Sequence, residues 1–247
     1  MKICIGISMG RGKIECEDSA FCDEMVFDTG IHEVDADAIR CLGVADGVGG
    51  NAGGRLASYF VAQKLTQTDF SSMTQEDIRL FMTELNNELL QYASTFQDQS
   101  GMATTLSALI VAEDGVYLLH GGNTRLYMTQ GDYLKQLTSD HTTYCRLREM
   151  GEYEAAERCS KSEIFCCLGG GDPRFSDSFV IRKVFEEGVP HRLMLTSDGI
   201  HDYVDIDTME AILASGDQDR FLAEALLNTA LKNGSGDDMT VIIITNS

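Results

Sequence analysis

The sequence has few basic side chains for its number of acidic ones. Of its 247 residues, 19 are Lys or Arg and 39 are Asp or Glu, which gives a formal net charge of −20 at pH 7. Nucleic acids and anionic membranes bind proteins through cationic patches, so this charge, spread along the chain, disfavours both as partners. The excess of carboxylates is compatible with divalent cations bound where acidic side chains cluster.

Proline and long apolar runs are also scarce. The two prolines are Pro173 and Pro190, and no Pro- or Ser-rich linker, low-complexity tract or repeat divides the chain. These absences predict one domain over residues 1–247 and disfavour solenoids and propellers. No stretch approaches the ~18 apolar residues of a membrane-spanning helix, and the N-terminus lacks a signal-peptide hydrophobic region. We therefore expect a cytoplasmic protein.

The eight cysteines contain no C-x-x-C pair, so the sequence gives little support to a zinc site. A reducing compartment keeps thiols free of disulfides. Cys4, Cys22 and Cys41 lie in apolar, strand-like runs. Buried, reduced thiols are the expectation for most of them.

Apolar and β-branched runs predict strands at both ends and in the middle of the chain. The predicted strands cover residues 2–8, 20–27, 39–45, 105–112, 116–122, 124–130, 191–197 and 239–245. Turn signals near residues 114 and 131 predict that the three middle strands form an antiparallel meander. Helical spacing predicts helices over residues 54–67, 74–96 and 218–232. Grouped strands with helices between them predict an α+β fold of antiparallel sheets covered by helices.

A glycine-rich stretch over residues 41–56 reads CLGVADGVGGNAGGRL. It lacks the lysine of a phosphate-binding G-x-x-x-x-G-K-S/T loop, and Ala52 breaks the G-x-G-x-x-G fingerprint of dinucleotide sites. What remains is Asp46 at the end of a predicted strand, followed by Gly47. Without a side chain, Gly47 lets its carbonyl approach whatever the aspartate holds.

Acidic residues adjoin three further predicted strands. They are Glu17-Asp18, Asp198-Gly199 and Asp237-Asp238. A single Asp-Gly pair is most often a turn, but four acidic sites at strand ends are harder to explain as unrelated turns. Carboxylates gathered at such ends repel one another unless a cation compensates them.

Oxygen ligands without a convincing His or Cys set favour Mg²⁺ or Mn²⁺ over zinc or copper. Two such ions that share a carboxylate would lie ~3.5–4 Å apart. They would hold a bridging water as hydroxide, which is the arrangement used for in-line attack on phosphorus.

Seven motifs occur in an order that resembles the metal-dependent protein phosphatases of type 2C, the PPM family. They are GKIECEDS, VADGVGG, GMATTLSALIV, HGGNTRLYM, LTSDHT, LTSDGIHDYV and GSGDDMTVIII. Each is weak alone, and the ordered set is specific. The resemblance covers nearly the whole chain and implies a four-layer α-β-β-α sandwich of two antiparallel sheets flanked by helices. It also implies a flap at about residues 141–171 beside the active site.

The resemblance implies a site for two Mg²⁺ or Mn²⁺ ions. Asp46 would bridge the two ions. Asp198 and Asp237 would complete the first site, and Glu17 and the Gly47 carbonyl would complete the second.

Several positions match the family less closely. Asp18 matches an acid that contacts metal-bound water. Lys13 replaces a phosphate-binding arginine, and its point charge can still meet a phosphate oxygen but orients it less firmly. Asn123 replaces an aspartate of a third metal site, which weakens the case for a third ion. Asp238 stands where asparagine is usual, and Val48 where many members carry a histidine proposed as general acid, so a metal-bound water is the default proton donor.

The sequence therefore predicts a phosphatase of phosphoserine and phosphothreonine, in which a metal-bridging hydroxide attacks phosphorus and Lys13 assists. The resemblance alone implies phosphoprotein substrates, opposition to a serine/threonine kinase and a monomeric state. One alternative is a pseudophosphatase, a regulatory or binding module that has lost catalysis, which Lys13 and Asn123 favour and the retained acids disfavour. Another is a hydrolase of small phosphoesters, which would need a base-binding pocket that the sequence does not reveal.

Overall fold

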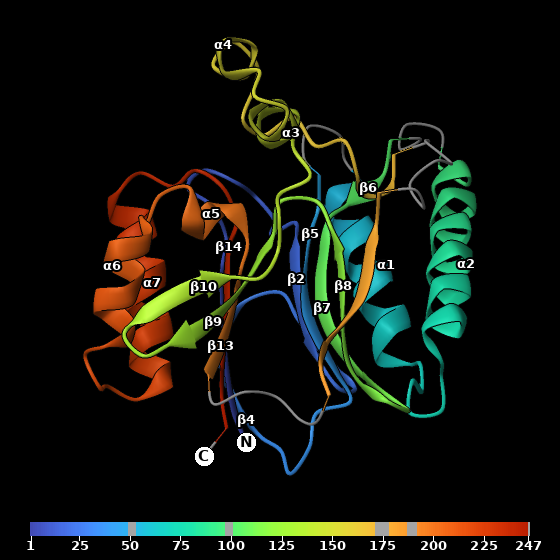
Figure 1. Ribbon diagram of the computed structural model, residues 1–247, viewed down its shortest axis with the longest axis horizontal. Coiled ribbons are helices and arrows are strands. Elements are labelled where there is room, and N and C mark those ends of the chain that lie inside the picture. Colours follow the sequence, from blue (N-terminus) through green and yellow to red (C-terminus); the bar gives the residue numbers. More distant parts are fainter. Residues whose placement is uncertain (49–52, 97–100, 171–177, 187–191, 247) are drawn as a thin grey trace.

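Two antiparallel sheets stack face to face and helices cover both outer faces (Figure 1). The computed structural model describes residues 1–48, 53–96, 101–170, 178–186 and 192–246. The predicted α+β class and the four-layer α-β-β-α sandwich are confirmed.

Each of the two sheets has six strands among the described residues. The first has the order β10 (Tyr133–Gln136), β9 (Arg125–Gln130), β13 (Arg192–Thr196), β14 (Met239–Thr245), β1 (Lys2–Ser8) and β4 (Gly30–Asp35). The second has the order β12 (Val180–Phe185), β8 (Gly115–Gly121), β7 (Leu106–Ala112), β5 (Cys41–Asp46), β2 (Asp18–Cys22) and β3 (Met25–Phe27). A short pair, β6 (Ala103–Thr104) with β11 (Leu168–Gly169), lies beside the second sheet.

The helices divide between the two outer faces (Figure 1). The second sheet is covered by α1 (Gly54–Thr66) and α2 (Gln75–Ser94), and the first by α5 (Asp198–His201), α6 (Ile206–Leu213) and α7 (Asp219–Lys232). Helix α2 begins at a capping box in which Thr74 and Asp77 exchange hydrogen bonds. No helix in the described residues is long and apolar enough to cross a membrane.

The pattern of β14, MTVIIIT, shows why the central strands are apolar without alternation. Ile242 and Ile244 pack between the two sheets, whereas Val241 and Ile243 pack against the helical layer that contains α7. A strand with a packed layer on each side buries both sets of side chains. The sandwich therefore has three apolar layers, one between the sheets and one under the helices on each outer face.

Two predictions about the strands were wrong. The predicted strand over residues 20–27 is two strands, because the chain turns at Asp23, whose φ of 50° is outside the strand range. The predicted meander fails because β7 and β8 form a hairpin in the second sheet, whereas β9 belongs to the first. The chain crosses between the sheets after Gly122, which has a φ of 109°.

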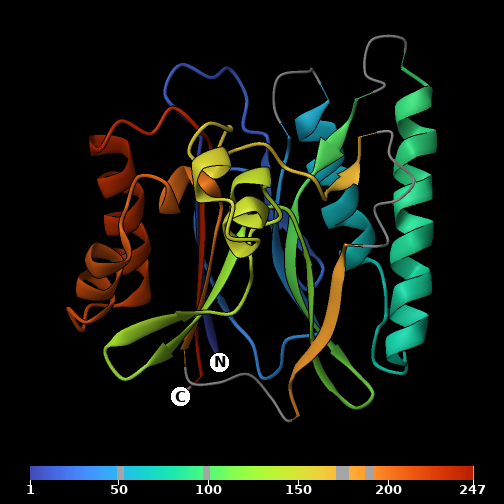
Figure 2. The same cartoon turned by 45° about the horizontal axis from the view of Figure 1, so that its top comes forward.

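A small helical segment projects from one end of the sandwich. It consists of α3 (Thr143–Glu149) and α4 (Tyr153–Ala156), and it stands over the gap between the two sheets at the end opposite the chain termini (Figures 1 and 2). Its position agrees with the flap expected at residues 141–171, of which residue 171 lies outside the described residues.

Candidate metal centre

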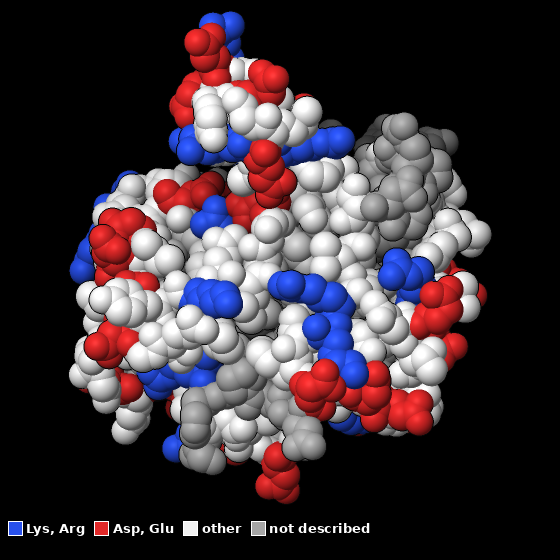
Figure 3. Space-filling model, viewed as in Figure 1, with Lys and Arg blue, Asp and Glu red and all other residues white. Residues whose placement is uncertain are grey.

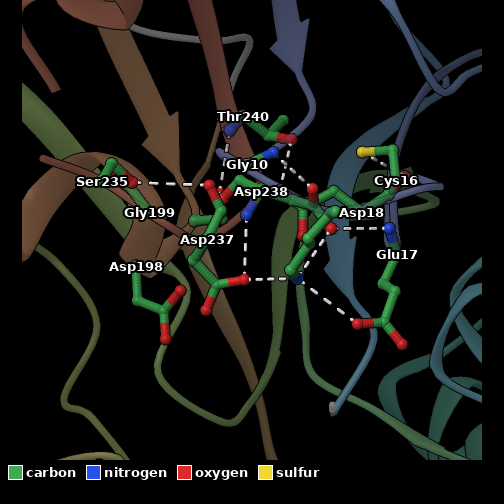
Figure 4. Close-up of polar contacts among 12 residues, drawn as sticks. Gly10, Cys16, Glu17, Asp18, Asp198, Gly199, Ser235, Asp237, Asp238 and Thr240 are labelled. Atoms are coloured by element: carbon green, nitrogen blue, oxygen red, sulfur yellow. Dashed lines mark hydrogen bonds and ion pairs between the residues drawn. The ribbon is translucent and has the colours of Figure 1, made fainter. Parts of the chain in front are cut away.

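The predicted acidic residues meet at the end of the sandwich beneath the flap. Asp18 begins β2 and lies opposite Asp46, the last residue of β5, in the register of the second sheet. Asp198 follows β13, and Asp237 precedes β14 in the first sheet. Because both sheets present these strand ends at the same end of the sandwich, residues far apart in sequence come together (Figure 4).

A cavity of about 440 Å³ opens at this point. Six of its lining residues are those predicted to bind metal or act in catalysis: Lys13, Glu17, Asp46, Gly47, Asp198 and Asp237. The other three predicted site residues lie beneath the lining and are almost fully buried, with 1% exposure for Asp18, 5% for Asn123 and 1% for Asp238. The structure thus brings all nine into one neighbourhood, and their roles toward metal remain predictions.

Backbone contacts fix Asp46 at its strand end. Its N–H donates to Thr105 Oγ1 at 3.1 Å, and its carbonyl accepts from the Thr105 N–H at 2.8 Å. The Thr104 hydroxyl donates to the same carbonyl at 2.9 Å. The next N–H, of Gly47, donates to the Glu17 carbonyl at 3.1 Å, which ties β5 to the loop that carries Glu17.

Glycine is required in this stretch for close packing. A Cβ on Gly47 would lie 2.4 Å from the carbonyl carbon of Gly54, and one on Gly54 would lie 2.6 Å from Glu17 Oε1. The start of α1 therefore packs directly against both Gly47 and Glu17. Gly49 and Gly50, the last two glycines of the VADGVGG motif, lie outside the described residues.

A second glycine brings Asp198 next to Asp237. A Cβ on Gly199 would lie 2.0 Å from the Asp238 carbonyl oxygen, so only glycine allows α5 to touch this backbone. The Ser235 hydroxyl also donates to the Gly199 carbonyl at 3.0 Å. These contacts join the end of β13 to the turn before β14 (Figure 4).

The carboxyl groups of the site are electrostatically unfavourable to one another. Burial, followed by the negative charges of Asp18, Asp198 and Asp237, raises the pKa of Asp46 well above its usual range. Burial is also the main reason that the pKa of Asp18 is raised to about 7 and that of Asp198 to about 6. Such a group of buried acids favours either protonation or a bound cation.

The donor atoms of the site fit a hard cation. Four buried side-chain polar atoms of the described residues lack a hydrogen-bond partner, and three of them are oxygens of Asp18, Asn123 and Asp198. The fourth is His201 Nε2. Unpartnered buried oxygens are costly unless a ligand satisfies them, and oxygen ligands suit Mg²⁺ and Mn²⁺.

The side chains nevertheless do not form a closed metal cage. Across the described ranges, no three His, Cys, Asp or Glu side chains converge on one point where they could hold an ion. The Lys13 ammonium instead joins the carboxylates, with Nζ 2.6 Å from Asp237 Oδ1 and 3.3 Å from Glu17 Oε2. Binding of an ion therefore requires these side chains to exchange partners.

Val48, noted above as a departure from the family, also lines the cavity. Five residues that the sequence did not single out line it as well: Thr105, Ser162, Ile164, Tyr203 and Gly236. Thr105 and Tyr203 lie within two of the quoted motifs, GMATTLSALIV and LTSDGIHDYV. Their place near the site could therefore have been predicted from the sequence. Ser162 and Ile164 belong to the flap and lie in none of the quoted motifs, so the sequence gave no indication that they reach the cavity.

Asn123 contacts Asp198 directly. Its Nδ2 donates to Asp198 Oδ2 at 2.8 Å, so the neutral amide supplies a donor where an aspartate would add a further negative charge. The interaction accounts for one oxygen of Asp198 and leaves Oδ1 unpartnered.

We expect Asn123→Asp to destabilise the metal-free protein by about 1–3 kcal/mol, because it replaces a hydrogen bond with charge repulsion at a buried site. Urea denaturation in EDTA measures this loss. Asn123→Ala, which removes the donor without adding charge, should lose less. Equal stability of Asn123→Asp and the wild type in EDTA would contradict the role assigned to this contact.

The stability of the metal-free protein should fall as pH rises. The pKa values of Asp18 and Asp198 are about 7 and about 6 in the folded state, against 3.8 for an ordinary aspartate. Raised folded-state values mean that the folded protein binds these protons more tightly, so their stabilisation is complete below pH 3.8 and is lost as pH rises through about 6 and about 7.

Urea denaturation in EDTA at about pH 5 and about pH 8 tests this linkage. The free energy of unfolding should decrease with pH more in the wild type than in Asp18→Asn, whose amide does not titrate. The same pH dependence in both proteins would show that Asp18 keeps an ordinary pKa.

The fold and the site together define a class of protein: an α-β-β-α sandwich that gathers carboxylates from both sheets at one end. The model of the family described as protein phosphatase 2C matches residues 11–233. The chain belongs to the protein phosphatase 2C family.

Two relatives illustrate the range of sequence similarity. Serine/threonine phosphatase stp of Listeria innocua is 31% identical over 211 residues, which are 81% of this chain and 82% of that protein. Serine/threonine protein phosphatase PstP of Mycobacterium tuberculosis is 29% identical over 210 residues, 83% of this chain and 40% of that protein.

Crystal structures confirm the fold. The phosphatase PstP/Ppp of Mycobacterium tuberculosis superposes with a TM-score of 0.78 at 25% identity, covering 98% of each chain. Stp1 of Staphylococcus aureus gives a TM-score of 0.79 at 24% identity, covering 99% of this chain and 94% of that one. A structure of the PstP catalytic domain is a complex with 2 manganese ions.

Proposed function

We propose that this protein is a metal-dependent protein serine/threonine phosphatase that hydrolyses phosphoserine and phosphothreonine. The observation that carries the proposal is the convergence of Glu17, Asp46, Asp198 and Asp237 on one cavity. The names of the family relatives, which are serine/threonine phosphatases, support protein monoesters as the substrate class.

The chain would hold two ions, Mg²⁺ or Mn²⁺, through oxygens of residues that line the cavity. Glu17 and the Gly47 carbonyl would serve one ion, Asp198 and Asp237 the other, and Asp46 both. When bound, such ions neutralise phosphate oxygens and lower the pKa of water that attacks phosphorus. Asn123 replaces the aspartate of a third metal site, and its amide already donates to Asp198. We therefore propose two ions and no third.

The remaining residues would position the phosphate. Lys13 is the only cation in the described cavity lining, and its ammonium would donate to a phosphate oxygen. Asp18 accepts a hydrogen bond from the Thr240 hydroxyl at 2.6 Å, which fixes the carboxyl behind Asp46. Ser162 and Ile164 of the flap and Tyr203 beyond α5 would contact the substrate on either side.

The cavity lining favours a protein substrate over a nucleotide. Among the described lining residues, Tyr203 is the one aromatic side chain and Lys13 the one cation, which is a poor set for a base and its sugar. Figure 3 shows charged side chains in the hollow beneath the flap, at a surface that a polypeptide can reach. The proposal also includes a single domain over residues 1–247 and a monomeric, cytoplasmic enzyme that opposes a serine/threonine kinase, without nucleic-acid or membrane partners.

Turnover of three substrates, each with Mn²⁺ and with EDTA, tests the proposal. The substrates are a phosphothreonine peptide, p-nitrophenyl phosphate and a nucleoside monophosphate. We expect Mn²⁺-dependent turnover with kcat/KM highest for the peptide. Binding of the peptide without turnover would favour the pseudophosphatase, and a preference for the nucleotide would favour the small-phosphoester hydrolase.

A further inference from the structure

Two of the positions that depart from the family pattern are in contact. Lys13 stands in place of arginine and Asp238 in place of asparagine, and Lys13 Nζ lies 3.0 Å from Asp238 Oδ2. Asp238 is only 1% exposed, whereas the Lys13 side chain is 27% exposed. The ion pair therefore has one end fixed in the protein interior and the other at the cavity.

Asp238 is surrounded by donors. Its Oδ1 accepts from the Gly10 N–H at 2.8 Å, and its Oδ2 accepts from the Glu17 N–H at 2.7 Å as well as from Lys13 (Figure 4). A carboxylate can accept all three hydrogen bonds. An asparagine would turn its NH₂ group toward at least one donor, so the carboxylate is the better match for this loop.

The loop over residues 9–17 is held against the turn that carries Asp237 and Asp238. A Cβ on Gly10 would lie 2.5 Å from the Gly236 carbonyl oxygen, which shows how closely the two backbones approach. Asp238 binds both ends of the loop, at Gly10 and Glu17, and the side chain of Lys13 between them. The lysine is thus anchored by its backbone and by its charge.

The Lys13 ammonium also contacts one proposed ligand from each metal site. Its Nζ is 2.6 Å from Asp237 Oδ1 and 3.3 Å from Glu17 Oε2. A lysine ammonium is a compact charge with three donors, and here it meets three carboxylates. Those two oxygens cannot serve the ammonium and a divalent ion fully at the same time.

We infer that Asp238 and Lys13 form a tethered cation: Asp238 keeps the Lys13 ammonium between Glu17 and Asp237, where it competes with the divalent ions for both carboxylates. The inference rests on the proposed function, because it takes Glu17 and Asp237 as metal ligands. Lys13 stabilises the acidic cluster before metal binds. When ions bind, it gives up Glu17 and Asp237, stays paired with Asp238, and has donors free for a phosphate oxygen.

Mn²⁺ binding to the purified full chain, measured by isothermal titration calorimetry, tests the competition. Lys13→Met should bind Mn²⁺ about tenfold more tightly than the wild type, a typical coupling between cations that exclude each other from shared groups. Arg11→Met is the matched control, because it removes one positive charge from an exposed position in the same loop. Arg11→Met should change the Mn²⁺ affinity only slightly at about 0.1 M salt and not at all at about 0.5 M. The tighter Mn²⁺ binding of Lys13→Met should persist at both salt concentrations.

Thermal unfolding distinguishes a tethered cation from a purely structural lysine. In EDTA, Lys13→Met should lower the unfolding midpoint by about 2–4 °C, and in saturating Mn²⁺ the loss should disappear. Asp238→Asn should lower the midpoint in both conditions, because Gly10 and Glu17 lose part of their acceptor. In EDTA the double variant should lose less stability than the sum of the losses of the two single variants, since both changes remove the contact between Lys13 and Asp238.

The outcomes separate this inference from the proposed function. If the wild type binds no Mn²⁺, the proposed metal centre is wrong. If the wild type binds Mn²⁺ and Lys13→Met binds it no more tightly, or loses equal stability with and without Mn²⁺, the tethered cation is wrong and the metal centre stands. If Lys13→Met does not fold, Lys13→Gln removes the same charge, and the same Mn²⁺ titration and thermal unfolding are measured on that variant.

Discussion

Replacing Asp46 with asparagine is expected to reduce Mn²⁺-dependent turnover by at least about 10³-fold, the scale of losing a charge-stabilising group in a dry active site. The charges of three other aspartates of the cluster act on Asp46. It pairs with Asp18 across the sheet, lines the cavity, and has a pKa raised first by burial and then by the charges of Asp18, Asp198 and Asp237. An amide in its place would weaken both proposed ion sites together.

The stability of Asp46→Asn should move in the opposite direction from its activity. Removing one negative charge from a repulsive cluster should keep or raise the free energy of unfolding in EDTA. Steady-state turnover of a phosphothreonine peptide and urea denaturation measure the two effects. Asp132→Asn, at the exposed turn between β9 and β10, is the control for loss of a carboxylate elsewhere. Turnover by Asp46→Asn within about tenfold of the wild type would contradict a shared role for this residue in both ion sites.

Gly199→Ala is expected to destabilise the protein by about 3 kcal/mol, because overpacking against backbone cannot be relieved by a rotamer change. The added Cβ would lie 2.0 Å from the Asp238 carbonyl oxygen and 2.8 Å from its carbonyl carbon. To avoid this clash, α5 must move away from the turn before β14. Asp198 would then separate from Asp237, and Mn²⁺ affinity should fall with stability.

Gly236→Ala provides a matched control in the same turn. A Cβ at this position meets nothing within 4 Å, so the substitution should leave the free energy of unfolding within about 0.5 kcal/mol of the wild type. Urea denaturation and Mn²⁺ calorimetry of both variants give the comparison. Equal effects from the two substitutions would mean that the contact between Gly199 and Asp238 does not hold the two strand ends together.

The central strands could be predicted from the sequence because both of their faces are buried. The run MTVIIIT of β14 is mostly apolar and is buried at every position but the last, and β1, β5 and β7 resemble it. Among the strands that the sequence did not predict, the longer ones are more exposed. Strand β4 has the sequence GIHEVD and lies at the edge of the sheet, where it is exposed along much of its length. Its composition therefore gives little indication of a strand. The short helices α3 to α6 span too few turns for a clear helical period.

The acidic positions of the site were visible in the sequence because each lies where an apolar run begins or ends. The residues that these acids contact could not be predicted from the sequence. The register that places Asp18 opposite Asp46 depends on strand pairing, and the change of sheet between β8 and β9 depends on tertiary packing. Only the structure joins Lys13 to Asp238 and Asn123 to Asp198, which turns separate departures from the family pattern into two specific contacts.

A crystal structure of the protein with Mn²⁺, using anomalous scattering to count the ions, is the most direct test of the proposed metal centre. We expect two manganese ions, with Asp46 bound to both, Asp198 and Asp237 on one, Glu17 and the Gly47 carbonyl on the other, and Lys13 withdrawn from Glu17 and Asp237. Manganese absent from this cavity, or present without contact to Asp46, would contradict it.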